Sequence, residues 1–217
     1  MITIAVIGVA IFLIILLMVN NTKAFGIGGI GILVLLVLMR ILPDILDGIL
    51  GKKQKEVKRA IRGADAEVQI DTLLNNLSED YYVLNDLVSP YGNIDHVVIC
   101  RNGSLFLLET KSHHGKVSVE NNVLYINGHL PEKDFIAQTL KNTYWLRERI
   151  TEITGVKNWV QPIIVFTNAF VPFMSPIKGI KVINKKYLIS IIKNTSGQGS
   201  ANSVLWEKRN KINVNLN

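Results

Sequence analysis

The chain has 217 residues, a formal net charge of +7 and a single cysteine. This length allows one domain of ordinary size and an appendage. One cysteine excludes an intrachain disulfide, and a disulfide-free chain is typical of a reducing compartment. Residues 1–50 carry two basic and two acidic side chains, so the whole positive charge belongs to residues 51–217. That part of the chain is therefore expected to meet a polyanionic partner.

Two apolar stretches open the chain. Residues 2–19 contain no charged side chain, and residues 24–42 contain only Arg40, near their end. Each stretch is about long enough to cross a bilayer as a helix. The sequence therefore predicts a two-helix transmembrane hairpin in residues 1–50, which contacts membrane lipid through residues 2–42.

Two other structures would also account for apolar stretches at the start of a chain. A cleaved signal peptide would account for the first stretch, but this stretch lacks a basic start and a small-residue cleavage site. Two helices of a soluble core would account for both stretches, but neither offers the polar face that such helices turn to water.

Basic residues follow the second apolar stretch. The polar turn between the stretches has one, Lys23, whereas residues 51–63 have six. Because basic loops stay on the cytoplasmic side, we expect two spans of the cell membrane with the N-terminus and the soluble domain in the cytoplasm. Residues 51–63 would be a basic juxtamembrane linker, and Lys52 to Arg62 would contact anionic headgroups.

The remaining sequence alternates between helix and strand patterns. Apolar residues three and four apart predict an amphipathic helix at 65–77, and a second helical pattern spans 135–150. The predicted strands are 81–88, 94–101, 105–111, 116–120, 123–126, 160–168 and 180–183. A helix is predicted at 187–193, a loop at 196–200, and nothing definite from 204 onward. This order predicts an α/β domain over residues 64–217, with a mixed central sheet flanked by helices and a core at about 64–170.

Two acidic residues lie on neighbouring predicted strands. Asp95 precedes, and Glu109 follows, an Asn102-Gly103 turn, so an antiparallel hairpin would carry one carboxylate on each arm. Strand periodicity puts Glu109 and Lys111 on one face. Two carboxylates favour a hard divalent cation, and a nearby lysine can contact phosphate or assist proton transfer. The pattern indicates metal-assisted hydrolysis of a phosphodiester, with a surface ion pair at a strand end as the alternative.

Four motifs stand in one order along the chain: Ala66-Glu67, Gly92-Asn93-Ile94-Asp95-His96-Val97-Val98, Leu108-Glu109-Thr110-Lys111 and Gln138-Thr139-Leu140-Lys141-Asn142. Together they resemble the nuclease-related domain family, NERD, of the PD-(D/E)xK nuclease superfamily. The resemblance covers residues 62 to 168 and implies a restriction-endonuclease-like core of a helix, three strands, a helix and a strand. Two positions depart from the pattern: Ile94 replaces the proline of the superfamily's name, and Ala66 replaces the usual glycine.

The resemblance implies a role for each motif residue on the two site strands. Asp95 and Glu109 would bind Mg²⁺ or Mn²⁺ together with the backbone carbonyl of Thr110. Lys111 would orient or activate the attacking water and stabilise developing charge.

Two helical residues complete the implied site. Glu67 would hold the metal or a metal-bound water, although an acid in a first helical turn is also favoured by the helix dipole alone. Gln138 would line the site, and an ordinary exposed helix residue is its alternative. His96 and Cys100 face away from Asp95 by strand periodicity, so both are expected to be structural.

These features predict a membrane-anchored, divalent-metal-dependent nuclease that hydrolyses DNA on the cytoplasmic side. The alternative is a membrane-tethered nucleic-acid-binding or scaffolding module that keeps the fold without catalysis.

Overall fold

The computed structural model describes residues 25–195 and 202–216. The chain divides into two compact units, one ending at Arg59 and the other beginning at Ala60. Helix α2 (Phe25–Leu74) contributes residues to both units, and its last turns take the place of the predicted helix at 65–77. The apolar stretch 2–19 lies outside the described residues. Within the described ranges no helix combines the length and apolarity needed to cross a membrane, so the predicted hairpin is not seen.

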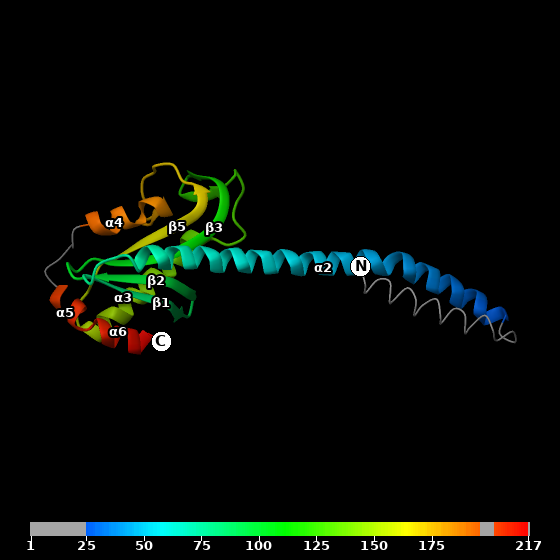
Figure 1. Cartoon of the computed structure of the whole chain (residues 1–217), viewed down its shortest axis with the longest axis horizontal. Helices are drawn as coiled ribbons and strands as arrows, with labels where there is room; N and C mark the ends of the chain where they lie inside the picture. Colours follow the sequence, from blue (N-terminus) through cyan, green and yellow to red (C-terminus); the bar gives the residue numbers. More distant parts are fainter. Residues whose placement is uncertain (1–24, 196–201, 217) are drawn as a thin grey trace. The chain divides into compact units, whose positions relative to one another are not determined.

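The second unit is built on one mixed sheet of six strands (Figure 1). The strands are β1 (Tyr81–Ser89), β2 (Gly92–Cys100), β3 (Leu105–Glu120), β4 (Val123–Ile126), β5 (Val160–Phe170) and β6 (Lys181–Asn184). Their order is β1-β2-β3-β5-β6, and β4 pairs with the distal part of β3. The first three strands are antiparallel, whereas β5 and β6 run parallel to β3. Helix α3 (Phe135–Thr154) precedes β5 and supplies the long connection that a parallel pair needs.

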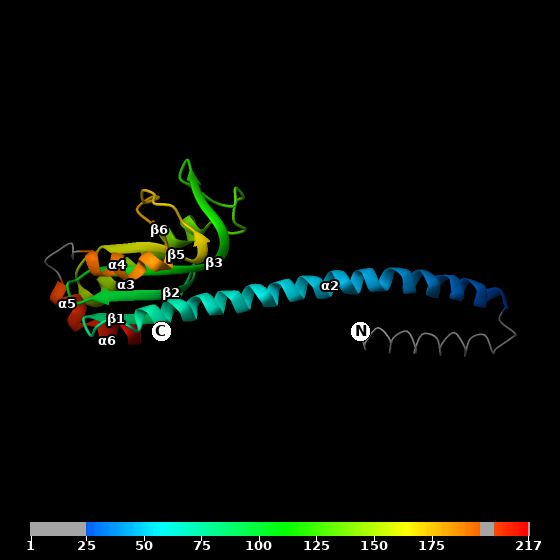
Figure 2. The same ribbon diagram turned by 45° about the horizontal axis from the view of Figure 1, so that its top comes forward.

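Helices cover both faces of this sheet, as Figure 2 shows. On one face, Leu146 and Ile150 of α3 pack with Leu105 and Leu107 of β3. The C-terminal helices α5 (Asn202–Glu207) and α6 (Arg209–Leu216) complete this cluster with buried Leu205 and Ile212, each wholly excluded from solvent.

On the opposite face, Ile70 and Leu74 of α2 pack with Phe106 and Leu108 of β3. Helix α4 (Leu188–Asn194), which follows the short 3₁₀ helix η1 (Lys185–Tyr187), adds Leu188 and Ile192. Alternate residues of β3 thus serve two separate apolar layers, as the strand period requires. The core confirms the predicted α/β class with a mixed central sheet.

The structure differs from the predicted elements in three places. The predicted strands 105–111 and 116–120 form one strand of 16 residues, because residues 112–115 continue the pairing with β5 through a register shift. The tail, left open by the sequence, forms α5 and α6 against the core. The helix predicted at 65–77 is continuous with the segment before it and ends at Leu74. The predicted loop 196–200 lies outside the described residues.

Candidate active site

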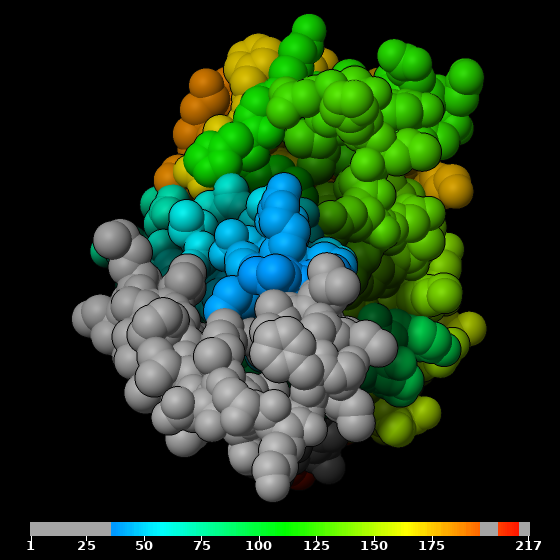
Figure 3. Space-filling model, turned by 90° about the vertical axis from the view of Figure 1, so that its right-hand side faces the viewer, coloured from blue at the N-terminus to red at the C-terminus, as the bar shows by residue number. Residues whose placement is uncertain are grey.

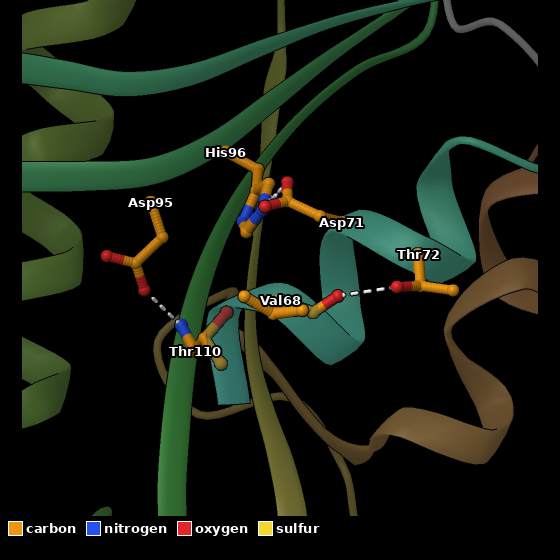
Figure 4. A network of polar contacts seen from close by, with 6 residues as sticks. All are labelled: Val68, Asp71, Thr72, Asp95, His96 and Thr110. Carbon is orange, nitrogen blue, oxygen red and sulfur yellow. Dashed lines mark hydrogen bonds and ion pairs between the residues drawn. The ribbon is translucent and has the colours of Figure 1, made fainter. Parts of the chain in front are cut away.

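The site begins where strands β2 and β3 separate. Their paired residues run from Ile99 and Leu105 to His96 and Leu108. Just beyond the last pair, the backbone N–H of Thr110 donates instead to Oδ2 of Asp95, at 2.6 Å (Figure 4). The Asp95 carboxylate therefore replaces a strand carbonyl as the acceptor, and this replacement fixes the side chain beside Glu109.

Glu109 lies deep in the domain, only 3% exposed. Its Oε1 accepts a hydrogen bond from Nζ of Lys111 at 2.5 Å, so the predicted side-by-side acid and base are present in the structure. The same Nζ lies 4.6 Å from the ring centroid of Phe135 on α3. The other oxygen, Oε2, is buried and has no hydrogen-bond partner among the described residues. A buried carboxylate oxygen without a donor is costly, and it marks a position that a cation would satisfy.

Asp95 shows the electrostatic cost of this arrangement. Burial, followed by repulsion from Glu109, raises the pKa of Asp95 from 3.8 to about 7. The Thr110 hydrogen bond and the Lys111 charge act in the opposite direction but do not cancel these effects. The lysine alone thus leaves two close carboxylates incompletely compensated, and perturbed carboxylates of this kind are typical of functional sites.

Glu67 approaches this pair from helix α2. Partial burial, and then the charge of Asp86 on β1, raise the pKa of Glu67, while His96 and Lys111 lower it. Glu67 in turn contributes to the raised pKa of Asp95. The structure therefore places the helix acid within electrostatic range of the strand carboxylate and lysine, although no hydrogen bond joins it to them in the described part of the chain.

A contact between Asp71 and the buried His96 holds α2 against β2. Nε2 of His96 lies 2.8 Å from Oδ1 of Asp71, and His96 is 2% exposed. Figure 4 shows His96 turned toward α2, whereas its neighbour Asp95 is turned toward Thr110. Asp71 follows Glu67 by four residues, so both lie on one face of the helix. The structural role expected for His96 agrees with this contact, but Asp71 was missed; its spacing from Glu67 was the available signal.

Gln138 on α3 lies at the edge of the site. Its Nε2 would come within 3.1 Å of a Cβ at Gly92, so the amide packs on the backbone at the start of β2. One turn later, the buried Asn142 accepts from Ser89 Oγ at 2.7 Å and donates to the Asn93 carbonyl at 3.4 Å. The two side chains hold α3 against the β1–β2 turn. In the described part of the chain, Gln138 donates no hydrogen bond to Asp95 or Glu109.

The side chains near Glu109 decide which kind of metal ion the site could bind. The described residues contain no group of three or more His, Cys, Asp and Glu side chains positioned to hold a metal ion. Mg²⁺ requires fewer protein ligands, because it keeps several waters and takes one or two carboxylates. Asp95 and Glu109, with the unpartnered Oε2 of Glu109, match that requirement.

The fold and site together define the class: an α/β domain in which adjacent strands bring two carboxylates and a lysine together, with a third acid on a covering helix. Residues 62–167 match the NERD family, described as a nuclease-related domain. This match agrees with the resemblance found at residues 62 to 168. No curated protein and no solved structure matches the chain.

Proposed function

We propose that this domain is a divalent-metal-dependent nuclease that hydrolyses phosphodiester bonds of DNA. The observation that carries the proposal is Glu109: a deeply buried carboxylate beside Asp95, with one oxygen on Lys111 and the other without a donor among the described residues. The match to the nuclease-related domain supports the same reaction class.

Asp95, Glu109 and the backbone carbonyl of Thr110 would hold Mg²⁺ or Mn²⁺. When bound, the cation would polarise a phosphoryl oxygen and lower the pKa of a bound water. Asp95 must lose its proton to act as a ligand, and its raised pKa makes this loss pH-dependent near neutrality. The ionised Asp95 would then be stabilised in place by the Thr110 N–H.

Lys111 would meet the negative charge that develops on the phosphate and orient the attacking water. Its Nζ is held between the Glu109 carboxylate and the Phe135 ring, and these contacts fix the ammonium group at the site. A positioned charge of this kind stabilises a transition state without reorganisation. Glu67 would accept a proton from, or position, a water at the helix side, and Gln138 would line the strand-β2 side.

We also propose that the chain is anchored in the cell membrane by residues 2–42, with the nuclease-related domain in the cytoplasm. In the described part of α2, eight large apolar side chains between Leu36 and Leu50 are exposed. The sequence before them is almost free of charge, and a basic segment follows. The chain should therefore remain in the membrane pellet after alkaline carbonate washing and be released by detergent, whereas recovery in the wash would contradict the anchor.

The nuclease proposal is tested with the full-length chain purified in detergent. Supercoiled plasmid and a linear duplex are incubated with Mg²⁺, Mn²⁺ or EDTA, beside Glu109→Ala. Glu120→Ala is the matched control, because Glu120 is an exposed acid at the other end of the same strand. Metal-dependent cutting that is lost in Glu109→Ala and kept in Glu120→Ala supports the proposal. Equal cutting by all three proteins would assign the activity to a contaminant.

The second candidate is a non-catalytic, membrane-tethered nucleic-acid-binding module. The positive charge beyond residue 50 favours it, and so does the direct pairing of Lys111 with Glu109. Its signature is DNA affinity that falls with salt and is unchanged in Glu109→Ala, with no cutting in either metal.

A further inference from the structure

A groove runs along the β6 edge of the sheet. It is bounded by the loop at residues 171–176, by residues 181–183 of β6, and by residues 187–191 at the start of α4, and it encloses about 470 Å³. We call it the β6 groove. Its walls are mostly apolar, and it lies outside the carboxylate site described above.

The β6 groove lies at the same level of the sheet as the carboxylates. Glu109 is aligned with Ile164 of β5, and Ile164 with Val182 of β6. Neighbouring strands are about 4.8 Å apart, so two spacings put the backbones of Glu109 and Val182 about 10 Å from each other. Figure 3 shows the yellow-to-orange surface after β5 next to the green surface of distal β3. Ile164 and Val182 are themselves buried, so the groove is a separate surface at the edge of the sheet that carries Glu109.

Aromatic side chains stand exposed at the β6 groove. Phe173 is fully exposed in the loop, and Tyr187 is 47% exposed on the facing wall. Phe170, at the end of β5, is 61% exposed just before the loop begins. Phe173 and Tyr187 both line the groove, and exposed aromatic side chains that share one apolar groove indicate a ligand that covers them.

The charge around the groove is of one sign. Residues 171–195 contain five lysines, Lys178, Lys181, Lys185, Lys186 and Lys193, and no acidic residue. In the described part of the chain, Lys181 and Lys186 form no ion pair with a carboxylate, and Nζ of Lys186 lies 4.8 Å from the Tyr187 ring centroid. Lysines without carboxylate partners beside exposed aromatic rings are complementary to a strand with phosphates and open base faces.

We propose that the β6 groove binds an unpaired segment of the nucleic acid on which the nuclease acts. Lys181 and Lys186 contact its phosphates, and Phe173 and Tyr187 stack on its bases. The segment must be unpaired, because a base inside a duplex has both faces covered by its neighbours and cannot reach these rings. The inference rests on the proposed function, since it names the structure of that substrate: a single strand, a flap or an open end rather than continuous duplex.

The test measures binding of a labelled single-stranded oligonucleotide by fluorescence anisotropy, with the full-length chain in detergent and EDTA. Phe173→Ala should weaken binding about tenfold, the effect of one lost base stack. Trp159→Ala is the matched control, because Trp159 is an exposed aromatic residue at the opposite end of β5 and should leave the affinity unchanged.

The lysines are tested through salt dependence. Each phosphate contact on a single strand contributes about 0.7 to the slope of log affinity against log salt, so Lys181→Gln with Lys186→Gln should reduce the slope by about 1.4. Lys157→Gln, exposed near the start of β5, is the control and should keep the wild-type slope.

Three results would overturn the inference. The first is an unchanged affinity of Phe173→Ala for the single strand, and the second is an equal affinity of the wild type for a blunt duplex. The third is that the groove variants bind phosphatidylserine vesicles less well than the wild type but keep its affinity for DNA. The last would assign the groove to lipid. Because binding is measured in EDTA, the two proposals fail separately. If the wild type cuts DNA but Phe173→Ala binds normally, the groove assignment is wrong and the nuclease stands. If nothing cuts but binding depends on Phe173, the groove assignment stands and the nuclease is wrong.

Discussion

Asp95 and His96 are neighbours on β2, yet their environments are opposite. His96 is buried against α2 and shares a hydrogen bond with Asp71, which holds two elements together. Asp95 faces Glu109 on the other side and carries a pKa raised to about 7 by burial and repulsion. One strand therefore places a stabilising contact and an incompletely compensated carboxylate in consecutive residues. The difference separates a residue that maintains the fold from one that the fold tolerates at a cost, which is the pattern expected of a functional site.

Asp95→Asn tests the functional side of this comparison and should have the largest effect. The amide oxygen can still accept from Thr110, so the local structure is kept, but the anionic ligand is lost. We expect Mg²⁺-dependent cutting to fall by at least about 100-fold, the scale of removing one key electrostatic group. Thermal unfolding in EDTA at pH 8 should show equal or higher stability, since the repulsion with Glu109 is relieved. A large loss of stability would place Asp95 with His96 as a structural residue.

Asp71→Ala tests the structural side. It leaves Nε2 of His96 buried without its partner, and Nδ1 of the same ring already has no partner among the described residues. The expected cost is about 1–3 kcal/mol of unfolding free energy, measured by urea denaturation in EDTA.

Asp71→Asn is the matched control, because its amide oxygen can still accept from the ring. It should recover most of the stability lost in Asp71→Ala. Equal destabilisation by both variants would show that the Asp71 charge, rather than the hydrogen bond, holds α2 in place.

The third prediction concerns pH. Because the folded-state pKa of Asp95 is raised from 3.8 to about 7, the folded chain keeps a proton that the unfolded chain loses in this range. The contribution of protonated Asp95 to the stability of the fold is complete below about pH 3.8 and is lost as pH rises through about 7. The raised pKa of Glu67 acts in the same direction. In EDTA, the unfolding temperature of the wild type should therefore decline more steeply between pH 5 and 8 than that of Asp95→Asn, to an extent of about a few degrees.

Added Mg²⁺ sharpens the pH experiment. The cation requires the ionised carboxylate, so its stabilising effect should grow as the pH rises through the same range and should be absent in Asp95→Asn. Stabilisation by Mg²⁺ that is equal at pH 5 and pH 8 would contradict a ligand role for Asp95.

The comparison also explains what the sequence could predict. Asp95, Glu109 and Lys111 were identified because strand periodicity and the Asn102-Gly103 turn determine which residues meet across a hairpin. The Asp71–His96 contact was missed because it joins residues 25 positions apart, through a helix orientation that periodicity does not specify.

The same limit applies to the C-terminal tail and to Asn142. Leu205 and Ile212 are completely buried, but they lie in short helices whose amphipathic pattern is weak. Their burial depends on packing against one face of the sheet, which the sequence of the tail does not specify. Asn142 was noted as part of a motif, but its contacts with Ser89 and Asn93 depend on the approach of α3 to a distant turn. Local patterns predicted the elements and the acids, whereas contacts between elements required the fold.

Gly92→Ala should have the smallest effect and tests how closely α3 approaches the start of β2. Gly92 has φ of +113°, which a side chain rarely adopts, and a Cβ there would lie 3.1 Å from Nε2 of Gln138. We expect a loss of about 1 kcal/mol in unfolding free energy, from backbone strain and the displaced amide. Gly128→Ala is the matched control, with φ of +77° and no atom within 4 Å of its added Cβ.

The two alanine variants are then repeated in a chain that also carries Gln138→Ala. If Gln138→Ala reduces the cost of Gly92→Ala but leaves the cost of Gly128→Ala unchanged, the close contact with Gln138 is part of what positions β2 and, three residues later, Asp95. If Gly92→Ala costs the same in the wild type and in Gln138→Ala, the effect comes from backbone strain alone, and Gln138 has no part in placing the carboxylate.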